Sequence, residues 1–118
     1  MNKALVAAGA INGGLAVAAG AFAAHGLRDR LEARSLEIFE TAARYQMYHA
    51  LAMILAAVIA TSDAKTAGWI FQAGIIVFSG SLYALALTDV KLLGAITPLG
   101  GLAFLAGWAW LAISALRG

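Results

Sequence analysis

The sequence contains no cysteine, a single proline and few charged side chains. Without cysteine the chain can form no disulfide, no thiolate metal site and no cysteine nucleophile. Charged residues make up 12% of the 118 residues, whereas a soluble domain carries about 25%. The formal net charge of +2 is too small and too dispersed to indicate a nucleic-acid partner. These shortages argue against a soluble domain and against a nucleic-acid-binding protein.

Hydrophobic residues, in contrast, are abundant and fall into four long runs. They make up 63% of the chain, and the mean hydropathy is +0.86. Too few polar side chains remain to cover a water-facing surface, so nearly all of this single domain must lie in lipid. We therefore predict an all-α membrane protein, a four-transmembrane-helix bundle. The spans are expected at about residues 4–25, 45–61, 68–88 and 98–116.

The first hydrophobic run can be interpreted in two ways. Residues 4–24 contain no charge and number about 21, enough to cross a hydrocarbon core of ~30 Å. A cleaved signal peptide is the alternative, with Lys3 as its basic region and Ala21-Phe22-Ala23 as a cleavage pattern. We favour a retained span, because the run exceeds a usual signal-peptide core and the remaining chain is also hydrophobic.

The longest polar region is predicted to contain an amphipathic interfacial helix, at about residues 35–44, between spans one and two. Ser35 would cap this helix, and Glu37 would favour its positive end. Glu40 and Arg44, four residues apart, would pair on one face. We expect the helix to run without a break into the second span. Its apolar face would carry Leu36, Phe39 and Ala43.

Thr97-Pro98 is the clearest helix-start signal in the chain. Threonine is a favoured N-cap residue, and proline at the first helical position forfeits no hydrogen bond. We therefore predict that the fourth helix begins at Pro98, after an apolar lead-in at residues 92–96. The alternative is a helix that begins near Leu92 and bends at Pro98.

Polar side chains gather toward the end of the bundle that holds the first and third loops. Within hydrocarbon such groups face inward and bond across helices. One interpretation is that their hydrogen bonds fix the order of the helices. Hydrogen bonds between membrane helices average only ~0.6 kcal/mol, so several would be needed. The other is a small pocket at that membrane face for a lipid headgroup, a small metabolite or a proton. The candidate ligand-binding residues are His25, Tyr45, Gln46, His49, Ser81, Tyr83 and Thr97.

The same residues limit the chemistry that we expect. His25 and His49 could together ligate a haem or a metal ion, but no carboxylate in the expected spans would complete a metal shell. We therefore expect no metal and no cofactor. The spans contain no carboxylate pair and no nucleophile–base arrangement, so we expect a protein that is not an enzyme. Membrane lipids are the expected partners, and a small homo-oligomeric transporter or channel is the alternative function.

Two further patterns concern packing. Gly9 and Gly13 form a GxxxG pair in the first span, for which contact within the bundle and dimerisation are alternatives. The three tryptophans lie toward the end opposite the polar cluster, where indoles favour the membrane interface. We expect Trp69, Trp108 and Trp110 to act as interfacial anchors.

Five strings in sequence resemble a known family: GAFAAHGL, YQMYHALA, FSGSLYALALT, ITPLGG and GW, beginning at residues 20, 45, 78, 96 and 107. Their order and spacing are similar to the YgdD family (domain of unknown function 423), which is also classed with the eukaryotic transmembrane protein 256. The resemblance covers essentially the whole chain. It implies four retained membrane helices, a bacterial inner-membrane location and an uncleaved first span. It supplies no catalytic residue, substrate or cofactor.

The distribution of basic residues predicts the orientation. The end that holds the first and third loops carries Arg28, Arg30, Arg34, Arg44 and Lys91, whereas the end that holds both termini carries Lys3, Lys65 and Arg117. Basic residues concentrate on the cytoplasmic side, so we expect both termini outside. A reporter fused to the C-terminus should therefore give an extracytoplasmic signal. A cytoplasmic signal would reverse the assignment.

Overall fold

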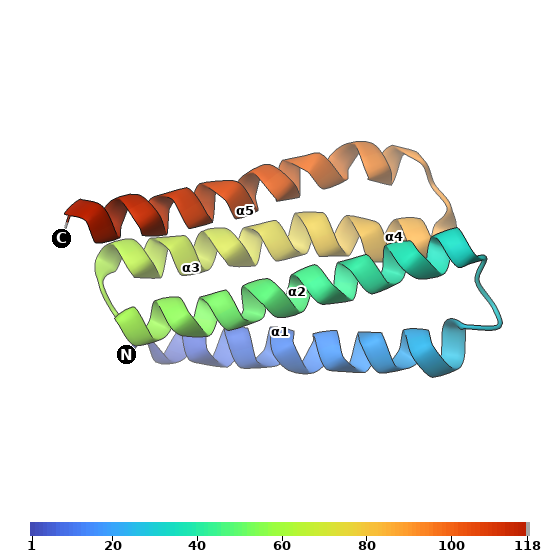
Figure 1. Cartoon of the computed structure of the whole chain (residues 1–118), viewed down its shortest axis with the longest axis horizontal. Coiled ribbons are helices and arrows are strands. Elements are labelled where there is room, and N and C mark those ends of the chain that lie inside the picture. The colour runs from blue at the N-terminus through green and yellow to red at the C-terminus, as the bar shows by residue number, and fades with distance from the viewer. Residues whose placement is uncertain (118) are drawn as a thin grey trace.

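The computed structural model describes residues 1–117 as a bundle of four antiparallel helical spans (Figure 1). The first is α1 (Lys3–Phe22), extended by a π-helical turn (Ala23–Leu27), and the second is α2 (Ala33–Ile59). The third joins α3 (Ser62–Gly74), a π-helical turn (Ile75–Ser79) and α4 (Gly80–Thr88), and the fourth is α5 (Leu92–Arg117). Each span has 25 to 27 residues and is apolar enough to cross a membrane. The predicted four-helix membrane bundle is confirmed.

The helices are arranged so that α2 and the third span form the centre. α1 packs along α2, α5 packs along α3 and α4, and α2 contacts both halves of the third span. α1 and α5 consequently lie at opposite edges of the bundle (Figure 1). The molecule is flattened, with extents of 49 × 26 × 18 Å. α1 therefore has only one long neighbour, and its contact with α3 is small.

Small residues and aromatic rings fit together in the core. A Cβ atom on Gly9 would lie 2.7 Å from Cγ1 of Ile54 and 2.9 Å from the carbonyl oxygen of Ala50, so α1 approaches α2 closely there. Gly107 of α5 receives the ring of Phe71 from α3 in a similar way. Gly9 thus serves contact within the bundle, the first of the two alternatives for the GxxxG pair.

The predicted start of the fourth helix at Pro98 is wrong, because α5 begins at Leu92 and Pro98 lies inside it. In lipid, a non-helical lead-in would leave several backbone groups without partners. That loss exceeds the single hydrogen bond that proline forfeits inside a helix. Thr97 is buried, and its hydroxyl donates to the carbonyl oxygen of Leu93 at 3.1 Å. The alternative start near Leu92 is therefore the one that the structure has.

The structure does not confirm a separate interfacial helix. Residues 35–44 belong to α2, which begins at Ala33, so Ser35 lies in its first turn and is not its cap. Phe39 and Ala43 are buried as the apolar pattern predicts, and Phe39 packs inside the bundle against the π-helical turn Ala23–Leu27. The guanidinium of Arg44 donates to the hydroxyl of Thr41 at 3.1 Å instead of pairing with an acid. The segment is thus part of the second span.

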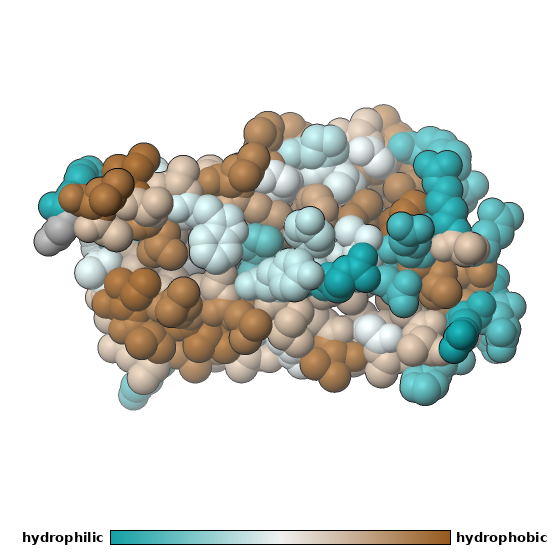
Figure 2. All heavy atoms as spheres, viewed as in Figure 1, coloured by the Kyte–Doolittle hydropathy of each residue, from teal (hydrophilic) through white to brown (hydrophobic). Residues whose placement is uncertain are grey.

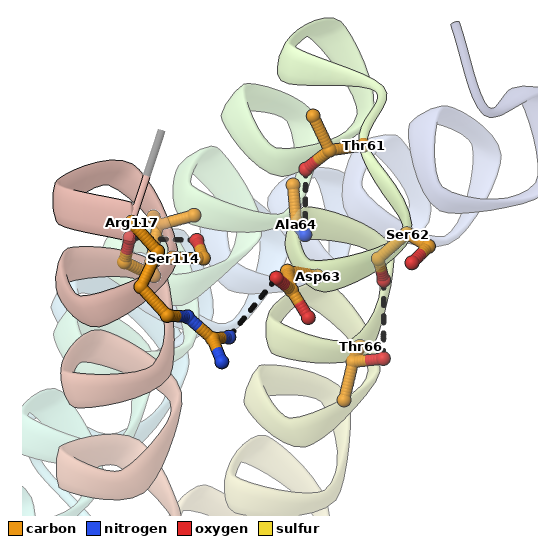
Figure 3. Close-up of polar contacts among 8 residues, drawn as sticks. Thr61, Ser62, Asp63, Ala64, Thr66, Ser114 and Arg117 are labelled. Atoms are coloured by element: carbon orange, nitrogen blue, oxygen red, sulfur yellow. Dashed lines mark hydrogen bonds and ion pairs between the residues drawn. The ribbon is translucent and has the colours of Figure 1, made fainter.

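Side-chain caps and short turns close both ends of the bundle. At the end near the termini, Ala60 adopts a left-handed conformation and Thr61 caps α3 by accepting from the amide of Ala64 at 3.0 Å. Arg117 of α5 reaches across to Asp63 at 3.2 Å (Figure 3). At the opposite end, where hydrophilic side chains gather (Figure 2), Lys91 lies 2.7 Å from Asp89. This hydrogen bond and the positive charge of Lys91 lower the pKa of the exposed Asp89 carboxyl.

Gly100 provides a test of the α5 packing. A Cβ atom there would lie 2.6 Å from Cβ and 2.7 Å from Cα of Phe78, so Gly100→Ala should force α5 away from the third span. Overpacking of this kind costs about 1–3 kcal/mol of unfolding free energy. Thermal unfolding in detergent measures the loss. The adjacent Gly101→Ala is the control, because its new methyl group would lie 3.9 Å from the Phe78 ring; equal stability of the two variants would contradict the packing.

Candidate functional site

A groove with a volume of about 970 Å³ runs along the bundle between α1 and the third span. It exists because α1 rests mainly on α2 and touches α3 only briefly. Ile11, Ile76 and Leu87 line it and are each more than half exposed, at 63%, 64% and 54%. The groove therefore opens on the outer surface of the bundle, which in a membrane faces lipid.

Four polar side chains line this apolar groove and form a chain of hydrogen bonds. The Tyr83 hydroxyl donates to Oε1 of Gln46 at 2.7 Å, and Nε2 of Gln46 donates to Oδ1 of Asn12 at 3.1 Å. Nδ2 of Asn12 then donates to Oε1 of Gln72 at 2.8 Å, and also to the carbonyl oxygen of Ala8 at 2.9 Å. The chain joins α1, α2, α3 and α4. Asn12 and Gln46, its two central members, are buried.

The chain has a direction and ends on Gln72. Each amide oxygen accepts from the preceding residue, which leaves Nε2 of Gln72 as the last donor. Within residues 1–117 this nitrogen forms no hydrogen bond. Every fully enclosed polar side-chain atom of the described chain has a partner, so Nε2 of Gln72 is not enclosed. Gln72 is half-buried and lines the groove. Its N–H groups are therefore available to a molecule in the groove.

The amides lie well inside their spans, far from the helix ends. Asn12 and Gln72 follow the first residues of α1 and α3 by nine and ten positions, which is about 14–15 Å at the α-helical rise. Gln46 stands 13 residues, about 20 Å, from either end of α2. The predicted site was at one membrane face, and it contained Gln46 and Tyr83 but neither Asn12 nor Gln72. One sequence signal could have identified Asn12 and Gln72: each is the single carboxamide in a hydrophobic run that contains no charged residue.

His49 belongs to a different arrangement, between α2 and α5. Nε1 of Trp108 donates to Nε2 of His49 at 3.1 Å, and Nδ1 of His49 lies 2.8 Å from the carbonyl oxygen of Tyr45. Because an indole N–H can only donate, Nε2 must accept and Nδ1 must carry the proton. The imidazole stacks on the Phe104 ring with centroids 3.5 Å apart. Both ring nitrogens of this buried histidine are thus used inside the protein.

The predicted roles of Trp108 and Tyr45 change accordingly. Trp108 is 41% exposed, and its indole N–H donates to His49 inside the protein, a contact that the anchor prediction did not include. Tyr45 contributes its backbone carbonyl to His49, and its ring lies in a shallow hollow shared with Tyr48 and Trp108. Moderately polar side chains follow this seam of α2 and α5 in Figure 2.

The remaining candidate residues do not join either arrangement. Ser81 of α4 and Thr97 of α5 form a buried hydroxyl pair at 2.6 Å, which links two neighbouring helices. His25 is exposed in the π-helical turn, beside residues that pack on Phe39. His49 lies ten residues, about 15 Å, further along α2 than Phe39. The two histidines are therefore at different depths, and no group of three potential metal-ligating side chains occurs within residues 1–117.

The His49–Trp108 contact can be measured by a double-mutant cycle. His49→Phe and Trp108→Phe each remove the hydrogen bond while retaining an aromatic ring, and the cycle should give a coupling free energy of about 0.6–1.7 kcal/mol. Thermal unfolding of the four proteins supplies the values. Trp110→Phe is the control for Trp108→Phe, since Trp110 is 43% exposed and forms no hydrogen bond to His49 within the described residues. A coupling indistinguishable from zero would contradict the hydrogen bond between Trp108 and His49, and with it the tautomer deduced from that bond.

Comparison with known proteins shows the family. The family described as "Protein of unknown function (DUF423)" matches residues 19–101. A UPF0382 membrane protein of Staphylococcus epidermidis is 47% identical, covering 98% of this chain and 97% of the relative. The UPF0382 membrane protein YwdK of Bacillus subtilis is 44% identical, covering 98% of both chains. No solved structure matches. The chain therefore belongs to the DUF423 family of membrane proteins, as the five motifs predicted.

Proposed function

We propose that this protein is a non-enzymatic, lipid-binding membrane protein that holds a lipid in the groove between α1 and the third span. The observation that carries the proposal is a lateral groove, open to the bilayer, with a hydrogen-bonded polar chain along one side. Its volume of about 970 Å³ is at the upper end of the ~300–1,000 Å³ typical of ligand pockets. Apolar walls suit a hydrocarbon chain, and the amides supply specificity.

The chemistry of the groove supports binding in preference to catalysis. Its polar side chains are three carboxamides and one phenol. Carboxamides neither gain nor lose a proton near neutral pH, so they are unsuited to general acid–base catalysis. His49, the most reactive buried group of the predicted cluster, has both nitrogens engaged on the α2–α5 side of the bundle. The groove is thus equipped to hold a molecule by shape and hydrogen bonds.

We further propose that the membrane is the bacterial inner membrane and that both termini face outward. The matched relatives are bacterial membrane proteins. The loops that join α1 to α2 and α4 to α5 hold Arg28, Arg30 and Lys91, whereas the loop that joins α2 to α3 holds no basic residue. This difference favours retention of the first two loops in the cytoplasm. With this orientation the basic end would also meet the anionic lipids of the inner leaflet.

A groove-filling variant tests lipid binding. Gly80 lines the groove, and a Cβ atom built there meets nothing within 4 Å. Gly80→Leu should therefore fold normally, gain helix propensity and occupy the space of the lipid. In native mass spectrometry of the detergent-purified protein, we expect the wild type to retain lipid and Gly80→Leu to lose most of it.

The matched control is Gly14→Leu, a similar change at an exposed position of α1 that lines no part of the groove and also has open space around it. It should retain lipid as the wild type does. Equal lipid retention in all three proteins would refute the groove as the binding site. The same spectra report the oligomeric state, and a discrete homo-oligomer without bound lipid would favour the transporter or channel.

A further inference from the structure

The groove is long and its polar groups are unevenly placed along it. On α1 its lining extends from Ala8 to Phe22, which is about 21 Å of helix. Gln72, the member of the chain with free donors, lies near the Ala8 end. Beyond it the lining toward Phe22 and Leu87 is apolar except for Tyr83, which bonds to Gln46, and Gln46, which bonds to Asn12. Asn12, which bonds to Gln72, precedes Phe22 by ten residues. A ligand that matches this pattern therefore has a polar group at one end and an apolar chain of roughly 15 Å inside the groove.

The free donors of Gln72 require an acceptor. Oε1 of Gln72 is held by Asn12 at 2.8 Å, which fixes the carboxamide of this groove-lining residue and leaves its Nε2 without a partner among residues 1–117. N–H groups in hydrocarbon are unfavourable without a partner. An acyl chain that entered from the far end of the groove would place its terminal methyl against these donors. The complementary ligand therefore carries a carbonyl oxygen at the Gln72 end.

Depth excludes the carbonyl groups of ordinary phospholipids. Gln72 stands about 15 Å along a third span that is 27 residues, about 40 Å, long, so it lies roughly 5 Å from the middle of that span. With the span centred in the bilayer, this is also its distance from the midplane. Ester carbonyls lie at the edge of the hydrocarbon core, about 15 Å from the midplane. A charged headgroup cannot follow such a carbonyl inward at acceptable cost. The ligand's polar head must be uncharged and must itself enter the core.

We infer that the groove binds a prenyl quinone, an uncharged ring with carbonyl oxygens on a long isoprenoid chain, and that Gln72 donates to one carbonyl oxygen. This inference rests on the proposed lipid-binding function and names the ligand class. The ring lies at the Gln72 end, and the isoprenoid chain follows the apolar wall past Leu15 and Gly80 toward Phe22. Asn12, Gln46 and Tyr83 are positioning residues, since their hydrogen bonds hold the Gln72 carboxamide in place.

The test uses the full chain in lipid nanodiscs with a short-chain ubiquinone as the probe. Its matched analogue is a prenylbenzene that has the same chain and no oxygen. Binding is measured by titration and by the mass of the complex. The wild type should bind the quinone roughly five- to tenfold more tightly than the prenylbenzene, as expected for one hydrogen bond. Gln72→Met, which keeps the length of the side chain without donors, should bind both probes equally.

Thr97→Val controls for the loss of a hydrogen bond between helices, because the Ser81–Thr97 pair lies outside the groove. It should bind the quinone as the wild type does. Equal affinity of the wild type for the two probes would overturn the quinone inference, and so would unchanged preference in Gln72→Met. If phospholipid is still retained and is lost in Gly80→Leu, the lipid-binding function stands alone. If neither probe nor phospholipid binds, both proposals fail.

Discussion

In the hydrocarbon core of a membrane, a backbone or side-chain polar group finds its hydrogen-bond partner inside the protein or in a bound molecule. This constraint explains why each span is helical along its whole length, including the turns before Pro98. It also explains why α2 extends from Ala33 without a break. A proline that would end a helix in water is tolerated here, because a frayed end in lipid would cost more hydrogen bonds than the proline removes.

The same constraint operates on the side chains and separates them into two groups. His49 is fully satisfied by Trp108 and the Tyr45 carbonyl, so its burial needs no ligand. The chain from Tyr83 through Gln46 and Asn12 gives every side-chain polar atom of its members at least one partner, except Nε2 of Gln72. The interactions that hold the helices together and the groove for which we propose ligand binding thus lie on different sides of the bundle.

The spans were predictable because hydrophobic runs of sufficient length are a local property of the sequence. The start of α5 was not, since the Thr97-Pro98 signal is a rule for helices whose ends are in water. The candidate site was predicted in part. Gln46 and Tyr83 were identified, but their partners Asn12 and Gln72 were missed. Counting residues from the ends of a helix estimates depth, but it does not show which faces of neighbouring helices are in contact. His25 was grouped with His49 for the same reason, and the structure places it at another depth.

By itself, the sequence determined that four apolar helices cross a membrane and that five motifs place the chain in its family. Both conclusions depend on residue types and their order along the chain. Only the tertiary structure decided that α1 leans on α2 and leaves a groove beside the third span. It also decided which amide donates to which, and hence that Gln72 keeps free donors. These features depend on the rotation of each helix about its axis and on how the helices pack against one another. When every face of a span is apolar, the hydrophobic periodicity of the sequence does not specify that rotation.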